Sequence, residues 1–138
     1  MRVMLLAAVA TAAVAAGVAL GAAPIAKPIP AATLKAEIAA FNAKNYAAAY
    51  TAYTPHYKAK CPYATFRKHQ AAQRAQIPGT LSLSVKFTSM KVSGAKAYLA
   101  YHVVLGGQVV ATVTAGKPDL FVRIDGLWYD ELDTQTTC

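Results

Sequence analysis

Residues 119–132 read Asp-Leu-Phe-Val-Arg-Ile-Asp-Gly-Leu-Trp-Tyr-Asp-Glu-Leu, and this stretch decides the fold. Asp125-Gly126 separates two runs of alternating side chains, which is a strong signal for a β-hairpin with a two-residue turn. Such a turn fixes the pairs as Ile124–Leu127, Val122–Tyr129 and Leu120–Glu131 on one face, and Arg123–Trp128 and Phe121–Asp130 on the other. We expect the first, more aliphatic face to form the core. On the second face, the guanidinium of Arg123 can lie over the indole of Trp128.

Three more strands are predicted before this hairpin. Apolar side chains alternate from Leu81 to Phe87, and the alternation then shifts by one residue at Met90 and Val92, as a β-bulge would produce. Ser93-Gly94 turns the chain into a strand over residues 95–105, and Gly106-Gly107 turns it into another over residues 108–114. Short turns between consecutive strands predict an antiparallel meander.

The first half of the chain predicts helices. Apolar side chains recur near the 3.6-residue helical period over residues 31–53, at Leu34, Ile38, Phe41 and Tyr53. Thr33 suits the N-cap, whereas Glu37 falls off the apolar stripe. Thr54-Pro55 ends this helix. After a short connection, a second helix is predicted from Pro62 to Gln76, because proline suits the first helical position and Pro78-Gly79 stops the helix.

The N-terminus resembles an export signal. Met1-Arg2 is followed by an uncharged, Ala-rich apolar run, and then by small residues at 21–23. This pattern predicts a signal peptide over residues 1–23, a proline-containing linker over residues 24–32 and one α+β domain over residues 33–138. We therefore expect a secreted or cell-envelope protein. The alternative is a retained membrane anchor, since roughly 20 apolar residues can span a bilayer.

The chain has two cysteines, Cys61 and Cys138. In an oxidising compartment, two cysteines predict one disulfide bond, which here would tie the last residue to the middle of the chain. The alternative is that they stay as buried thiols.

Charge is unevenly distributed along this basic chain. The formal net charge is +8, yet every acidic residue except Glu37 lies at or after Asp119. The basic surface can contact an anionic partner such as lipid headgroups or cell-wall polymers, although the lysines and arginines are scattered, which favours a role in solubility alone. No nucleic-acid-binding motif is present, so we expect no nucleic acid partner.

Helices followed by an antiparallel meander form an α+β plan. The chain resembles the nuclear transport factor 2-like (cystatin-like) superfamily over residues 31–133. The resemblance rests on the hairpin run 121–129 and on five residues of the first helix, Ala39, Phe41, Asn42, Tyr46 and Tyr50. It implies N-terminal helices packed on a curved sheet, which closes into a cone with a pocket at its mouth. The superfamily includes isomerases, dehydratases, cyclases and domains without catalysis, so the resemblance indicates the fold more than the function.

Candidate catalytic residues are few. The three histidines, His56, His69 and His102, fall on separate elements without a metal-binding spacing, so we predict no metal site and no cofactor. The isomerase-like members of the superfamily use a pocket carboxylate with a tyrosine donor. In this chain, that chemistry would fall to Asp130, with Tyr101 and His102 as donors. However, Asp130 belongs to an acidic run of the kind that is usually exposed.

Binding without catalysis is the preferred interpretation. Eight tyrosines are spread over the helices and the sheet, and tyrosines can line an apolar pocket with polar groups at its wall. We expect an apolar or amphipathic small molecule to contact five residues, Tyr53, Tyr57, Tyr101, His102 and Trp128. The alternatives are an isomerase- or dehydratase-like enzyme, and a homodimeric module joined through an exposed patch of Phe121, Arg123 and Trp128.

Overall fold

The computed structural model describes residues 22–138, and in this range the chain has the predicted α+β class. The helices are α2 (Pro30–Asn42), α3 (Tyr46–Thr51), α4 (Pro55–Lys60) and α5 (Tyr63–Ala75). The strands are β1 (Leu83–Ser93), β2 (Lys96–Leu105), β3 (Gln108–Val113), β4 (Asp119–Ile124) and β5 (Leu127–Asp130). The predicted signal peptide or anchor falls almost entirely on residues 1–21, outside the described part.

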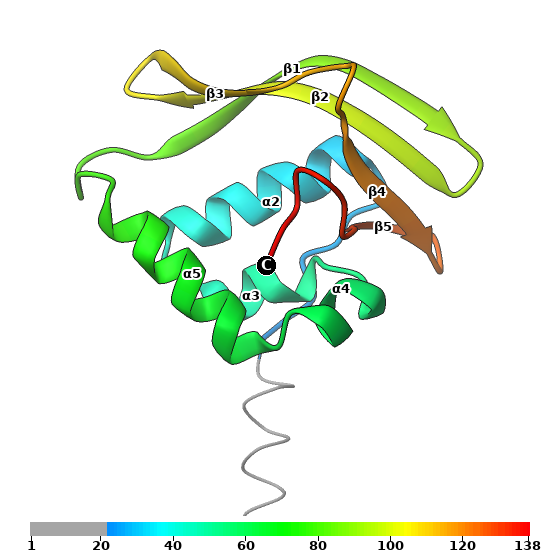
Figure 1. Cartoon of the computed structure of the whole chain (residues 1–138), viewed down its shortest axis with the longest axis horizontal. Coiled ribbons are helices and arrows are strands. Elements are labelled where there is room, and N and C mark those ends of the chain that lie inside the picture. Colours follow the sequence, from blue (N-terminus) through cyan, green and yellow to red (C-terminus); the bar gives the residue numbers. More distant parts are fainter. Residues whose placement is uncertain (1–21) are drawn as a thin grey trace, which may run out of the picture.

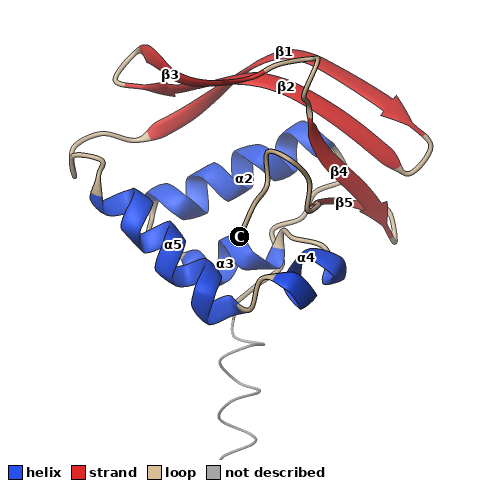
Figure 2. Ribbon diagram, viewed as in Figure 1, coloured by secondary structure: helices blue, strands red, loops and turns tan. Residues whose placement is uncertain are grey.

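The helices and the sheet form two layers around α2. The antiparallel sheet arches over α2, while α3, α4 and α5 lie on the opposite side of that helix (Figures 1 and 2). Leu34 of α2 packs against the inner face of the sheet, where Leu99 and Phe121 are fully buried. A second cluster joins α3, α4 and α5 around Phe66 and Tyr57. The helical layer and the sheet are therefore held by separate apolar clusters that meet at α2.

Strand β2 organises the sheet. One edge of β2 pairs with β1, and the other edge pairs with β4 over Lys96–Leu99 and with β3 over Tyr101–Leu105. The register of β1 shifts between Phe87 and Ser89, so the predicted bulge is confirmed. Because bulges increase local twist and bend a strand, this one contributes to the curvature of the sheet.

The terminal hairpin has the predicted register, but its faces are reversed. Ile124 pairs with Leu127 and Phe121 with Asp130, across a turn in which Asp125 and Gly126 have φ values of 51° and 81°. The Arg123 guanidinium lies 5.6 Å from the Trp128 ring centre, as predicted. The face expected to form the core is only half-buried, whereas Phe121, Trp128 and Asp130 are 0–4% exposed. The second face therefore forms the core.

The predicted long helix over residues 31–53 is wrong, because the chain breaks it into α2 and α3. Lys44 adopts a left-handed φ of 57°, and the Asn45 side chain then caps α3 by accepting a hydrogen bond from Ala48 N at 3.2 Å. The break turns α3 against α5 and buries Ala48 and Ala49. Thr33 is not the N-cap either, since α2 begins at Pro30 after Ile29.

Thr33 instead joins three segments of the chain. Its buried hydroxyl accepts a hydrogen bond from Lys27 N at 2.9 Å and donates one to Trp128 O at 2.9 Å. We expect Thr33→Val to leave these two backbone groups without a partner, and to lower the free energy of unfolding by about 1–3 kcal/mol. Urea unfolding measures this change, with the exposed Thr80→Val as the control. Equal midpoints for the wild type and Thr33→Val would contradict the prediction.

The C-terminal tail folds back onto the helical layer. Cys61 and Cys138 form a disulfide bond, as predicted, with their Cα atoms 5.4 Å apart. This bond places the last residue beside the start of α5, and the tail leading to it reaches the interior between the two layers (Figure 1).

Among residues 22–138, no helix combines the length and apolarity that a membrane crossing requires.

Candidate functional site

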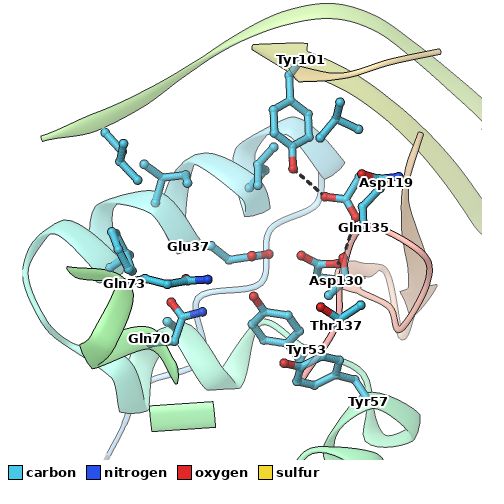
Figure 3. A pocket seen from close by; sticks show the side chains of 17 residues that line it. Glu37, Tyr53, Tyr57, Gln70, Gln73, Tyr101, Asp119, Asp130, Gln135 and Thr137 are labelled. Carbon is cyan, nitrogen blue, oxygen red and sulfur yellow. Dashed lines mark hydrogen bonds between the residues drawn. The ribbon is translucent and has the colours of Figure 1, made fainter. Parts of the chain in front are cut away.

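A cavity of about 290 Å³ lies between α2, the inner face of the sheet, α5 and the C-terminal tail. Its apolar wall comes mainly from α2, and its polar wall from carboxyl, hydroxyl and amide side chains (Figure 3). The polar lining residues are Glu37, Tyr53, Tyr57, Gln70, Gln73, Tyr101, Asp119, Asp130, Gln135, Thr136 and Thr137. This volume is sufficient for a small organic molecule.

Three carboxyl groups from different elements meet at one end of the cavity. Glu37 comes from α2, Asp119 from the first position of β4 and Asp130 from the last position of β5. Their exposed fractions are 6%, 2% and 3%. Figure 3 shows the carboxyl group of Glu37 directed at that of Asp130, with the Tyr53 hydroxyl beside them.

The position of Asp130 is set by backbone pairing on both sides. On one side, Asp130 is the register partner of Phe121 in β4. On the other side, Asp130 N donates to Ala52 O at 2.8 Å, and Asp130 O accepts from Thr54 N at 3.0 Å. The segment after α3 therefore covers the edge of β5 and holds Asp130 in the interior.

Hydrogen bonds connect Asp119 and Asp130 through the tail. The Tyr101 hydroxyl donates to Asp119 Oδ2 at 2.8 Å. Thr136 Oγ1 lies 2.8 Å from Asp119 Oδ1 and 3.0 Å from Asp130 Oδ1. A hydroxyl carries a single proton, so Thr136 can donate to one of these oxygens at a time. Both contacts are full hydrogen bonds when one carboxyl group carries a proton, and the hydroxyl is otherwise shared between two ionised oxygens.

Glu37 has an unsatisfied acceptor inside the cavity. In residues 22–138, Glu37 Oε1 is the buried side-chain oxygen that lacks a hydrogen-bond partner. An acceptor buried without a partner is costly and is uncommon in folded proteins. Glu37 Oε1 is therefore the point in the cavity where a hydrogen-bond donor would stabilise the protein most.

Burial raises the pKa of all three carboxyl groups. Burial raises the pKa of Glu37 well above its usual value, and the charge of Asp119 adds to this effect. Burial and then the charge of Glu37 raise the pKa of Asp130. Burial raises the pKa of Asp119 to about 6, against hydrogen bonds from Thr136 and Tyr101 that lower it. Burial therefore favours the protonated forms of Glu37 and Asp130 most strongly, while the pKa of about 6 leaves Asp119 largely ionised at neutral pH.

Tyrosine hydroxyls in the cavity also keep their protons. Burial raises the pKa of Tyr57 to about 12, and burial also raises the pKa of Tyr53 and Tyr101. No lysine, arginine or histidine is among the described residues that line the cavity. Buried Arg74 points elsewhere, and its guanidinium donates to Asn42 O and Ile77 O. A basic protein thus encloses an acidic interior.

The structure brings together part of the predicted site. Asp130, Tyr53, Tyr57 and Tyr101 all line the cavity. Asp130 is buried, although its acidic run was expected to be exposed, because β5 directs this side chain inward while Glu131 faces His56 outside.

Two other expected residues lie elsewhere. His102 contacts Thr112 Oγ1 at 2.9 Å on the opposite face of the sheet from Tyr101, since consecutive strand residues face opposite sides. Trp128 is packed in the core beside Leu34 and does not line the cavity. The expected dimer patch is also absent, because Phe121 is fully buried and Trp128 is 4% exposed, leaving Arg123 exposed alone.

The sequence contained signals for the two carboxyl groups that were missed. Glu37 stands three residues after Leu34 and four before Phe41, so it lies on the buried face of α2 rather than beside it. Asp119 shares strand parity with Phe121, and both are buried. Because Asp119 and Asp130 lie on the same face of the hairpin as Phe121, burial of that face implies burial of both carboxyl groups.

The acidic cluster does not have the form of a metal centre. Within the described range, no three His, Cys, Asp or Glu side chains are grouped so that they could hold a metal ion.

Comparisons of the chain with protein-family models, with curated proteins and with solved structures found no match. The geometry of the cavity is therefore the basis for a functional proposal.

Proposed function

We propose that this chain is an exported, non-catalytic binding domain of the nuclear transport factor 2-like class that holds a small organic molecule in the cavity under its sheet. A helix lying across the concave face of a bulged antiparallel sheet supports the class. The disulfide bond supports maturation in an oxidising compartment. The single observation that carries the binding role is the half-open cavity lined by three buried carboxyl groups and three tyrosines.

The energetics of the cluster favour a binding role over packing. A buried ionised carboxylate costs several kcal/mol, and a buried protonated one still needs hydrogen-bond partners that an apolar side chain of similar volume does not. Glu37 Oε1 has no hydrogen-bond partner, so the contacts within the cavity compensate this cost only in part. A ligand that supplies hydrogen-bond donors would recover part of it.

A thermal-shift screen tests this proposal. The protein, with its disulfide intact, is heated with sets of small cationic, anionic and neutral compounds. A compound that binds the cavity should raise the melting temperature, because a ligand that binds only the folded state stabilises it. Ala49→Phe, which fills the cavity wall, should abolish the shift, while His102→Ala on the outer face should keep it. Failure of every charge class, together with no co-purified mass in native mass spectrometry, would overturn the proposal.

A second candidate function is general acid–base catalysis. The observation that favours it is a carboxyl group whose pKa is about 6, at Asp119, in a cavity shared with Asp130 and Tyr101. Such a site would move a proton at carbon next to a carbonyl, as isomerases and dehydratases do. Proton–deuterium exchange of a small cyclic ketone, followed by NMR, tests it. Asp119→Asn should lower the rate roughly 100-fold, and no exchange above the buffer rate would exclude the candidate.

A further inference from the structure

The charge of the cavity narrows the chemistry of its ligand. Its carboxyl end holds Glu37, Asp119 and Asp130, and no basic side chain among the described lining residues balances them. An anionic ligand would be repelled by any carboxyl group of the cluster that ionises. A neutral ligand would gain nothing from the ability of these groups to ionise, and the groups are not arranged to hold a metal ion. A cation of organic type remains.

We propose that the cavity binds a small organic cation, an ammonium or amidinium compound with an apolar body. This inference rests on the proposed binding function and specifies its ligand class. The cationic head would lie beside Glu37 and Asp130, where it can donate to the unpartnered Glu37 Oε1. An ammonium group offers three N–H donors and no acceptor, which suits a site made of carboxyl and hydroxyl oxygens.

The walls fit the rest of such a molecule. Leu34, Ile38 and Phe41 of α2 provide an apolar surface next to the carboxyl end. Tyr53 and Tyr57 stack with ring centres 4.3 Å apart, and aromatic faces attract cations. The amides of α5, at Gln70 and Gln73, lie at the other end of the cavity and can bond a polar tail of the ligand (Figure 3).

Binding of a cation would be coupled to loss of a proton. The titratable groups that face the site are Glu37 from α2, Tyr53 and Tyr57 from the α3–α4 region, Tyr101 from β2, Asp119 from β4 and Asp130 from β5, with Asp133 of the tail next to Asp119. From α5 come only uncharged amides. A proton on one carboxyl group lets Thr136 form hydrogen bonds with both Asp119 and Asp130, and a bound cation would displace that proton.

Calorimetry with matched probes tests the inference. The probes are benzylamine, benzamidine, their neutral counterpart benzyl alcohol, and benzoate. We expect the two cations to bind at least roughly tenfold more tightly than the alcohol, and benzoate not to bind. Titrations in two buffers of different ionisation enthalpy should show proton release, with affinity increasing up to about tenfold per pH unit for each proton released.

Two variants locate the site. Glu37→Gln keeps the shape of the side chain but removes its charge, so cation affinity should fall roughly tenfold or more, while binding of benzyl alcohol should not weaken. Asp130→Asn gives a second, independent removal of charge. His102→Gln, on the outer face of the sheet, should leave affinity unchanged. Circular dichroism checks the fold of each variant.

The outcomes separate the two proposals. Benzyl alcohol binding as tightly as benzylamine, with no proton release, would overturn the cation inference and leave the binding function standing. Cation binding that persists unchanged in both charge-removal variants would place the site elsewhere and also overturn the inference. If none of the probes binds and the thermal-shift screen also finds nothing, the binding function itself fails. The measurements on the wild type keep the test valid even if a variant does not fold.

Discussion

Reducing the Cys61–Cys138 bond is expected to lower the free energy of unfolding by about 4 kcal/mol. The bond joins residues that are 77 apart in sequence, so it removes much conformational entropy from the unfolded chain. In the folded chain, Cys61 is fully buried in the cluster that contains Phe66 and Tyr57. The last residues of a chain fray unless they are held, and this bond holds them.

The effect of the disulfide bond can be measured by comparing the oxidised and reduced forms of the wild-type protein. Urea unfolding of the oxidised protein and of the same protein in dithiothreitol should give clearly different midpoints. The double variant Cys61→Ala/Cys138→Ala is the control, since dithiothreitol should not change its midpoint. Equal midpoints for the oxidised and reduced wild type would contradict the prediction.

Loss of the bond should also affect the cavity. Thr136 lines the cavity and contacts Asp119 and Asp130, while Asp133 accepts a hydrogen bond from Leu120 N at 2.6 Å. Without the covalent link, such hydrogen bonds and the packing of Leu132 against the helical cluster are left to hold the tail in place. We expect faster hydrogen exchange at Leu120 N in the reduced protein, which would report release of the tail from β4.

Local signals in the sequence predicted the hairpins of the sheet well, but the predicted meander is wrong, because β4 pairs with β2 rather than with β3. The two-residue turns at Asp125-Gly126 and Gly106-Gly107 have the left-handed backbone that such turns need, and their identity alone indicates it. Given the first turn, the pairing of Phe121 with Asp130 follows without further information. The bulge near Phe87 was visible as a change of parity. These features depend on neighbouring residues, so a linear pattern contains them.

The buried face of the hairpin depended on tertiary structure. By hydrophobicity, the face with Val122 and Ile124 is the better core, yet the protein buries the face with Asp119, Phe121 and Asp130. The aromatic side chains outweigh the aliphatic ones because α2 packs against them through Leu34. The acidic residues are buried with them because strand parity leaves no choice.

The break in the first helix was hidden for a similar reason. Alanine-rich sequence on both sides of Lys44 favours continuous helix, and no glycine or proline marks the turn. The left-handed backbone at Lys44 is compensated by the capping side chain of Asn45 and by packing of Ala48 and Ala49 against α5. Only the packed structure shows that this gain exceeds the local cost.

The second large effect is expected in the pH dependence of stability. A carboxyl group whose pKa is higher in the folded than in the unfolded state makes the folded protein bind more protons. The contribution of this group to the free energy of unfolding is fully present below its pKa in the unfolded state. It is lost as the pH rises through its pKa in the folded state. For Asp119, the rise from 3.8 to about 6 corresponds to about 3 kcal/mol lost between those values. Glu37 and Asp130 have raised pKa values as well, so they extend the loss to higher pH.

Glu131 affects the pH dependence of stability in the opposite direction. Hydrogen bonds from Leu132 N, Thr54 and His56 lower the pKa of Glu131 against the effect of its partial burial. Its contribution is present above the unfolded pKa and is lost as the pH falls. Glu131 therefore opposes the buried cluster only in the acid range. Over the neutral range, the three buried groups set the slope, and the free energy of unfolding should decrease with increasing pH.

Urea unfolding between about pH 5 and about pH 8 measures this slope. Glu37→Gln removes one of the buried titrating groups, so it should flatten the slope and make the protein more stable than the wild type at the alkaline end. Asp125→Asn, in the exposed turn, removes a carboxyl group of equal charge outside the cluster and should leave the slope unchanged. A wild-type stability that rises over this range would show that the cluster is ionised in the folded state. The acidic interior would then lack the stored protons on which the coupling between cation binding and pH depends.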